Sequence, residues 1–320
     1  MTNNITTWGL SFLFSIACLS THAAKYPVTV IDDRNKEVVF ETQPKTVASI
    51  SVFGADLMAA LGERAAGLST LNHKQSAFLG EELRYIEDLG EVHETNMELL
   101  TKLDPDLTIG IRTYTEPFEK KFEEIGKFLA FDMVTYKDSI RAIETVGTAL
   151  GKRQSALQLN AKFADQLSEF KEKAPGGLSV VMLWHWGNVQ YAFFDHHLTV
   201  EIMRTLGITN SFGESPNKNI KKMDSAPLSM EALLKLDPDI IISFKGEDGP
   251  VLNHPVWSRL SATINGRVYR IGDQYVMPHG PIARDMVLRE VAYLFYPEYF
   301  PQPTDIPENA RATQTTFTTD

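Results

Sequence analysis

The chain carries the same fourteen-residue pattern twice, and this repeat constrains its fold more than any other feature. Residues 96–109 read NMELLTKLDPDLTI and residues 229–242 read SMEALLKLDPDIII, with nine identical positions at an offset of 133. Each copy predicts a short helix, a turn at Asp-Pro-Asp and an apolar strand. Two copies are too few for a solenoid, so the repeat predicts two similar lobes with a ligand bound between them.

Helix and strand patterns alternate in both halves of the chain, which is typical of parallel α/β sheets. In the first half, an apolar strand at 46–51 precedes a helix at 54–61, and a further strand falls at 107–111. In the second half, a strand at 179–183 begins the same alternation, and a helix at about 281–295 closes it. We therefore predict an α/β fold of two similar lobes with parallel sheets and a ligand cleft between them.

Between the halves, a helical pattern with few breaks extends from Asp138 to about Lys173, with Gly147 and Gly151 as points where it could bend. Pro175 ends the pattern. At 1.5 Å per residue, some 30 helical residues span roughly 45 Å, enough to join both lobes as one long rigid helix. The predicted organisation is an N-terminal lobe at 24–136, a connecting helix at 137–175, a C-terminal lobe at 176–301 and a polar, disordered tail at 302–320.

The N-terminus has the pattern of an export signal. A short apolar stretch at 9–20 is followed by small residues suited to cleavage, which predicts a signal peptide at residues 1–23. The only cysteine, Cys18, lies inside this segment, and lipid attachment there is the alternative to a free exported protein. The mature chain would then have no cysteine, which excludes disulfides, thiolate metal sites and cysteine nucleophiles.

Composition and motifs argue against several classes of function. A formal net charge of −10 disfavours a general nucleic-acid surface, which needs a basic face. The sequence lacks the G-x-S-x-G, Walker A and dinucleotide glycine motifs, so we expect no enzyme activity and no cofactor. No histidine pair has H-E-x-x-H spacing, and we predict no metal site of that kind. A metal-dependent enzyme is the least favoured alternative.

Several motifs follow one another in the order of a known family. After the export signal they are 44–49 (PKTVAS), 54–56 (GAD), 96–100 (NMELL), 105–107 (PDL), 229–231 (SME), 238–240 (PDI) and Trp257. Over roughly residues 28–300 the chain resembles the periplasmic substrate-binding proteins of iron–siderophore, haem and cobalamin ABC importers. The resemblance implies two α/β lobes joined by one rigid helix, and a periplasmic protein, which we expect to be a monomer. It also implies delivery of ligand to an inner-membrane ABC permease with its cytoplasmic ATPase.

Two basic residues occupy equivalent places in the repeat, Arg112 after the first strand and Lys245 after the second. Ligands of open parallel sheets lie beyond the carboxyl ends of the strands, so both residues are candidates for the cleft. An opposed pair of cations suits an anionic ligand. Together with the resemblance, this predicts a ferric siderophore of the catecholate or citrate type. Haem, cobalamin or a free metal ion are the alternatives.

Aromatic residues supply the other candidates for ligand contact, since large flat ligands are held by aromatic area and a few polar groups. Trp184, His185 and Trp186 lie where a strand of the C-terminal lobe meets a Gly-Asn turn. Alternation along a strand puts the two tryptophans on one face and the histidine on the other, so only one set can line the pocket. Weaker candidates, taken from strand ends and loops, are Phe53, Tyr114, Tyr275 and His279.

Glu98 and Glu231 are the equivalent acids of the two repeat helices. The resemblance implies that one such acid on each lobe docks onto basic residues of the permease. An acid in this position also suits a helix N-terminus, and Thr95 with Glu98 has the spacing of a capping box. Both roles are compatible with one another.

Overall fold

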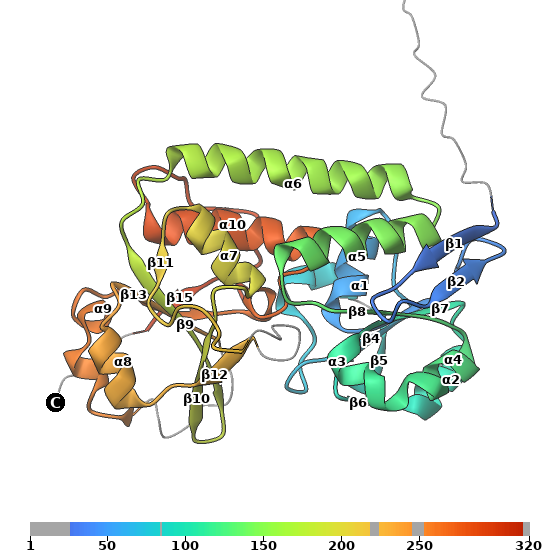
Figure 1. Ribbon diagram of the computed structural model, residues 1–320, viewed down its shortest axis with the longest axis horizontal. Coiled ribbons are helices and arrows are strands. Elements are labelled where there is room, and N and C mark those ends of the chain that lie inside the picture. The colour runs from blue at the N-terminus through green and yellow to red at the C-terminus, as the bar shows by residue number, and fades with distance from the viewer. Residues whose placement is uncertain (1–25, 84, 218–223, 245–252, 316–320) are drawn as a thin grey trace, which may run out of the picture.

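The computed structural model describes residues 26–83, 85–217, 224–244 and 253–315, which form two α/β lobes side by side (Figure 1). The predicted fold class is confirmed, because each lobe is built on its own sheet with parallel strands at its centre. The export signal and Cys18 lie outside the described residues. Within the described ranges, no helix combines the length and apolar character needed to cross a membrane.

The N-terminal lobe is a six-stranded sheet in the order β6-β5-β4-β3-β7-β8, parallel except for the β5–β6 pair. A separate antiparallel hairpin, β1–β2, precedes it. The strands are β1 Val28–Ile31, β2 Glu37–Phe40, β3 Val47–Ile50, β4 Gly67–Thr70, β5 Glu87–Glu91, β6 Glu94–Thr95, β7 Leu107–Ile111 and β8 Lys127–Phe131. The helices are α1 Val52–Ala60, η1 Ala77–Leu83, α2 Met97–Leu103, α3 Arg112–Thr115, η2 Glu116–Phe118 and α4 Glu119–Ile125.

The C-terminal lobe is a seven-stranded sheet whose centre, β11-β9-β13-β14, is parallel and whose outer strands β10, β12 and β15 pair antiparallel. The strands are β9 Ser179–Trp186, β10 Val189–Phe193, β11 Thr209–Asn210, β12 Ser225–Pro227, β13 Ile240–Phe244, β14 Val268–Ile271 and β15 Thr313–Gln314. The helices are α7 Leu198–Thr205, α8 Met230–Leu236, η4 Trp257–Arg259, α9 Ser261–Ile264 and η5 Asp273–Tyr275.

The sequence repeat produces the same local structure in both lobes. Asn96 caps α2 by accepting a hydrogen bond from the backbone of Leu99, and Ser229 caps α8 in the same way. Both helices end at a left-handed aspartate, Asp104 at φ 49° and Asp237 at φ 37°. The expected capping box from Thr95 is therefore wrong, because the helix begins one residue later and Asn96 is the residue whose side chain accepts from the free amide.

The last aspartate of each Asp-Pro-Asp turn holds the start of a neighbouring strand. Asp106 accepts hydrogen bonds from the amides of Lys45 and Thr46, each at 2.8 Å. Asp239 accepts hydrogen bonds from the amide and the hydroxyl of Ser179, at 2.8 and 2.7 Å. Thr46 and Ser179 are themselves 133 residues apart in the chain. The repeat thus includes the first strand of each sheet, beyond the fourteen residues that the sequence comparison identified.

The predicted single connecting helix is wrong in one respect: it is two antiparallel helices, α5 Tyr136–Ala149 and α6 Arg153–Lys173 (Figure 1). The break falls at Gly151, whose φ of +70° is a left-handed conformation that glycine adopts without strain. Helix α5 packs into the core of the N-terminal lobe, and α6 alone runs across both lobes over about 31 Å.

The two helices approach closely at Gly147. A Cβ atom on this glycine would lie 2.4 Å from the Cβ of Ala156, so no larger residue fits without moving one helix. Because an unbroken apolar stripe is compatible with one long helix or with two packed ones, the sequence pattern did not separate these alternatives.

A third helix, α10 Pro281–Phe295, also links the lobes. Asp56 of α1 accepts hydrogen bonds at 2.8 Å from the amides of Ile282 and Ala283, the first free amides of α10. Farther along, Val287 and Val291 pack in the core of the C-terminal lobe. Helices α6 and α10 lie along the same side of the molecule, opposite α2 and α8 (Figure 1).

The expected disordered tail is wrong for residues 302–315. Ile306 and Ala310 pack in the core cluster of the N-terminal lobe, and Thr313–Gln314 forms β15 on the sheet of the C-terminal lobe. The segment therefore contacts both lobes. Its polar, proline-rich composition concealed this, because hydrogen bonds hold much of it, such as those from Gln274 to the carbonyl of Ala310 and from the amide of Ala312 to Glu290.

Candidate functional site

The N-terminal lobe contributes Arg112, the first residue of α3, directly after the carboxyl end of β7. Its Nε lies 2.8 Å from Oδ1 of Asp132, which follows β8, and its Nη1 donates a hydrogen bond of 3.0 Å to the carbonyl of Asp33. The side chain remains 26% exposed. The guanidinium is thus held in a fixed orientation by its own lobe, and Asp132 offsets much of its charge.

Tyr114 follows on α3 and faces the other lobe. Its side chain is 37% exposed, yet burial raises the pKa of the phenol to about 12, and the nearby charge of Asp224 adds to the shift. Asp224 immediately precedes β12 in the C-terminal lobe, and burial raises its pKa too. Tyr114 of the N-terminal lobe and Asp224 of the C-terminal lobe therefore lie near each other across the space between the lobes.

The C-terminal lobe contributes a group of three rings on the β9–β10 hairpin, which we call the aromatic platform: Trp184, Trp186 and Tyr191. Trp184 pairs across the hairpin with Tyr191, and their ring centroids are 5.0 Å apart. The two tryptophan rings meet edge to face at 5.9 Å. Trp186 is 57% exposed. The predicted alternation is confirmed, since His185 lies on the opposite, buried face.

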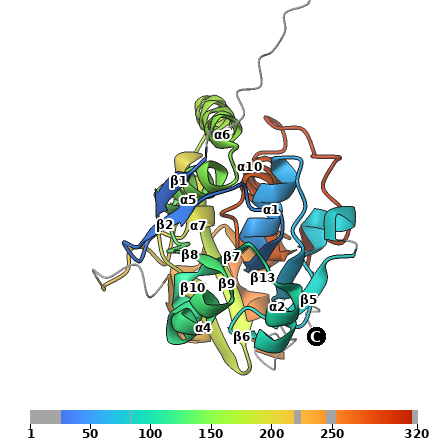
Figure 2. The ribbon, with the colours of Figure 1, turned by 90° about the vertical axis from the view of Figure 1, so that its right-hand side faces the viewer.

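The platform lies on the side of the sheet that faces the N-terminal lobe. Strand alternation puts Trp184 on the same face as Val180 and Met182, which belong to one buried cluster. Leu71 from the loop after β4 of the N-terminal lobe packs against that cluster. Figure 1 shows β10 and α3 on different lobes, and Figure 2 shows the molecule from the side of the N-terminal lobe, where α4 and β10 overlap in the view.

Four of the predicted contact residues are buried in this structure. His185 is 5% exposed and lies 3.4 Å from polar atoms of Gln190 and Ser243. Phe53 is 2% exposed. In this structure both side chains point into the core, because a residue after a strand or before a helix can turn its side chain into the core as readily as out of it.

The two candidates in the loop before α10 are buried as well. Tyr275 is fully buried and its hydroxyl donates a hydrogen bond of 2.8 Å to Glu290. His279 is 4% exposed, and burial lowers its pKa to about 3. Lys245 lies outside the described residues, so its predicted role is unchanged.

Two residues of the site were not predicted from the sequence. Tyr191 could have been found, because a two-residue turn at Gly187 and Asn188 sets the register that places it opposite Trp184. Asp224 had no local signal, since its position depends on how β12 returns to pair with β10.

Glu98 and Glu231 occupy the same position in α2 and α8, two residues after the cap, and both are exposed. The amide of its own residue and the side chain of Ser229 lower the pKa of Glu231, so this carboxylate is ionised at neutral pH. Helices α2 and α8 lie on different lobes but on the same side of the molecule, away from α6 (Figure 1).

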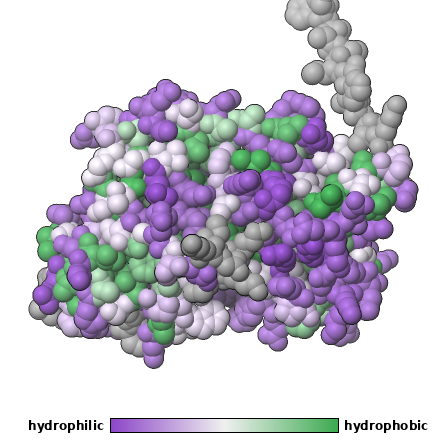
Figure 3. All heavy atoms as spheres, viewed as in Figure 1, coloured by the Kyte–Doolittle hydropathy of each residue, from purple (hydrophilic) through white to green (hydrophobic). Residues whose placement is uncertain are grey.

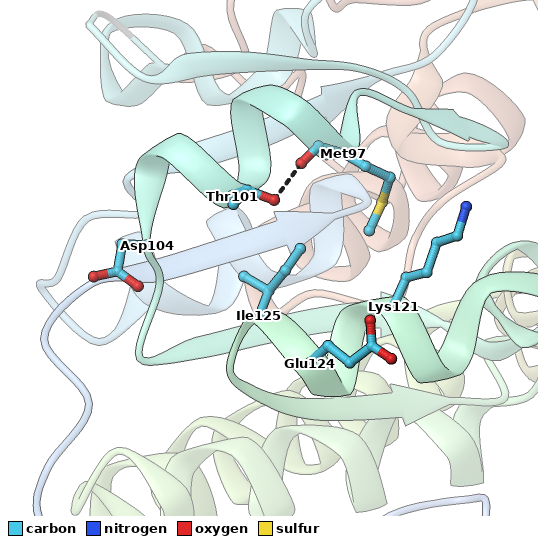
Figure 4. A pocket seen from close by; sticks show the side chains of 6 residues that line it. All are labelled: Met97, Thr101, Asp104, Lys121, Glu124 and Ile125. Carbon is cyan, nitrogen blue, oxygen red and sulfur yellow. Dashed lines mark hydrogen bonds between the residues drawn. The ribbon is translucent and has the colours of Figure 1, made fainter.

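A shallow hollow lies between α2 and α4, away from the platform (Figure 4). Met97 and Lys121 point toward each other across it, with Ile125 and Glu124 below. Figure 3 shows mostly hydrophilic side chains over the N-terminal lobe and more hydrophobic ones over the C-terminal lobe. Among the described residues, no group of three or more His, Cys, Asp or Glu side chains could hold a metal ion.

Comparisons with known proteins agree with this architecture. The chain is 27% identical over 281 residues to the putative ABC transporter substrate-binding lipoprotein YhfQ of Bacillus subtilis, covering 81% of this chain and 86% of that protein. The petrobactin-binding protein YclQ of Bacillus subtilis has a similar structure, with a TM-score of 0.72, 18% identity, and 85% and 99% of the two chains covered.

A second solved structure is that of the siderophore-binding protein BauB, bound to a complex of two acinetobactin molecules and ferric iron. It has a TM-score of 0.68 and 20% identity, with 84% of this chain and 99% of that chain covered. The sequence model of the periplasmic binding proteins matches residues 47–275, from the first strand of the N-terminal sheet to η5. The chain therefore belongs to the periplasmic binding protein family.

Proposed function

We propose that this protein is an exported receptor that captures a ferric siderophore between its lobes and delivers it to an inner-membrane ABC permease. The observation that carries the proposal is a pair of side-chain groups, one on each lobe, at the carboxyl ends of parallel strands. After β7 of the N-terminal lobe lie the oriented guanidinium of Arg112 and the phenol of Tyr114, and at the end of β9 of the C-terminal lobe lies the aromatic platform. We infer that the two groups face each other as the walls of one ligand site. Such a space suits a large chelate with apolar faces and polar oxygen atoms.

The proposed action is binding without turnover. The chain's family consists of substrate-binding proteins, and the relatives named above are described as binding proteins of ABC transporters or of siderophores. We propose a catecholate or citrate chelate, because Arg112 is positioned to donate hydrogen bonds to oxygen anions. The expected stoichiometry is one chelate per chain, bound by a monomer.

Delivery is proposed to depend on Glu98 and Glu231. Their equivalent positions on two lobes would give a permease two acidic contacts at a fixed separation, set by the helices that link the lobes. Export is proposed from the N-terminal signal, with lipid attachment at Cys18 as the alternative; the YhfQ protein is itself described as a lipoprotein.

A fluorescence titration of the mature protein tests the proposed ligand class. Tryptophan emission would be followed during addition of ferric catecholate, ferric citrate, ferric hydroxamate, haem, cobalamin, Zn²⁺ or Mn²⁺. Saturable one-to-one quenching at submicromolar ferric catecholate or citrate is the expected result. Quenching only by haem, cobalamin or a bare metal ion would keep the receptor and replace its ligand. No response to any of them, with calorimetry in agreement, would overturn the proposal.

A further inference from the structure

The aromatic platform offers ring area that the fold itself does not need. Trp186 and Val189, at the turn of the β9–β10 hairpin, are 57% and 42% exposed. A Trp–Val cross-strand pair at a hairpin end is held by its backbone register, so the hairpin forms without burying the outer indole face. Leaving this apolar area in water costs free energy unless a ligand covers it.

The N-terminal lobe also has exposed aromatic side chains. Tyr114 and Phe118, one helical turn apart on α3 and η2, are 37% and 43% exposed. Of the nine large exposed hydrophobic side chains among the described residues, these two follow β7 in the N-terminal lobe and the pair on the hairpin lies at the end of β9 in the C-terminal lobe. Aromatic area is therefore present on both elements that flank the space between the lobes.

The two walls offer more exposed aromatic area than net positive charge. The guanidinium of Arg112 is 2.8 Å from Asp132, and Asp224 adds a carboxyl group beside Tyr114. A small aliphatic polycarboxylate chelate offers little surface other than its charge, and so gains little from exposed rings. A chelate with aryl groups gains from stacking against them, because ring pairs are attractive in offset and edge-to-face arrangements.

We propose that the ligand is an aryl chelate, with catechol or other phenolate rings, and that at least one of its rings stacks on Trp186. The inference rests on the proposed receptor function and selects between the ligand types left open there. The platform would set specificity through the outer surface of the chelate, while Arg112 would contact its oxygen atoms.

The test compares two chelates that share Fe³⁺ but differ in aryl groups, ferric tris-catecholate and ferric citrate, by calorimetry. Wild-type protein should bind the catecholate at least tenfold more tightly. Trp186→Ala should weaken catecholate binding roughly 5- to 100-fold, the usual range for loss of one stacking partner, and Trp186→Phe should recover most of it. Tyr299→Ala is the matched control, because Tyr299 is also 57% exposed but lies beside Pro297, after α10.

The outcomes separate the two proposals. Equal or tighter binding of ferric citrate, or catecholate binding that Trp186→Ala leaves unchanged, would overturn the aryl inference while the receptor function stands. Failure of wild-type protein to bind either chelate, or a ferric hydroxamate, would overturn the proposal that the ligand is a ferric siderophore. Circular dichroism of each variant would show that the fold is retained.

Discussion

Among single residues, two buried histidines determine how the protein should respond to acid. His197 and His279 are 1% and 4% exposed, and burial lowers the pKa of each from 6.5 to about 3. His197 precedes α7, and Ser139 of α5 donates a hydrogen bond to the carbonyl of His279, so both lie where the helices of the two lobes meet. Protonating either one in the folded protein is unfavourable.

We therefore predict that the two histidines contribute a loss of stability as pH decreases from about 6.5 to 3, because their imidazoles bind protons in the unfolded chain over this range and do not in the folded chain. Each histidine contributes a slope of up to about 1.4 kcal/mol per pH unit. Asp56 opposes part of this slope. Burial raises the pKa of Asp56 to about 7, so the stability that its protonated form contributes is present at low pH and is lost as pH rises toward 7.

Denaturant unfolding at pH 7, 6, 5 and 4 would measure this dependence. The slope of the free energy of unfolding against pH counts the protons taken up on unfolding. His279→Gln should lower that number by about one, whatever its effect on stability at pH 7. The control is His73→Gln, since the His73 side chain is 90% exposed. The same slope in His279→Gln and wild-type protein would show that His279 titrates normally.

Arg112 contributes both to the fold, through its ion pair, and to the proposed ligand site. Arg112→Ala should weaken chelate binding by about 1–3 kcal/mol, the usual range for hydrogen bonds to charged groups. It also removes a partner of Asp132, whose side chain is 1% exposed, so some loss of stability should accompany it. Calorimetry would measure the affinity. Arg204→Ala is the control, because Arg204 is a 47% exposed arginine on α7 whose contact with Asp195 is longer, 3.5 Å; equal effects would remove Arg112 from the site.

Among the elements, the α5–α6 pair depends on one small contact. Gly147→Val should lower the free energy of unfolding by about 1–3 kcal/mol, because the new side chain would meet Ala156 and separate the helices. Chemical denaturation would measure it. Ser155→Ala, at an exposed position in α6, is the control and should change stability by less than about 0.5 kcal/mol. No effect of Gly147→Val would mean that the helices are not packed as described.

How far the sequence predicts these elements depends on the kind of signal. The repeat helices and strands were predictable because capping residues, the Asp-Pro-Asp turn and an apolar strand occur together, twice. The break at Gly151 and the ordered tail were not, since they depend on contacts between distant segments such as Gly147 with Ala156. In the site, alternation separated Trp184 and Trp186 from His185, but side-chain direction at Phe53, Tyr275 and His279 required the fold.

For the protein as a whole, Glu98 and Glu231 matter as a pair. Reversing both charges, Glu98→Lys with Glu231→Lys, should abolish uptake of the iron chelate by cells and leave its affinity for the isolated protein unchanged. The physical reason is that two repulsive contacts replace two attractive ones on the permease. A matched control reverses two other exposed acids, Glu172 and Glu298. Normal uptake with the first double variant would contradict the docking proposal.

The central claim is that a ligand binds between the lobes and contacts both of them. Hydrogen exchange, with and without a saturating ferric catecholate, tests it most directly. A ligand bound between the lobes should protect backbone amides in α3 of the N-terminal lobe and in the β9–β10 hairpin of the C-terminal lobe, at the same ligand concentration. Protection confined to one lobe, or centred on the hollow between α2 and α4 (Figure 4), would contradict it.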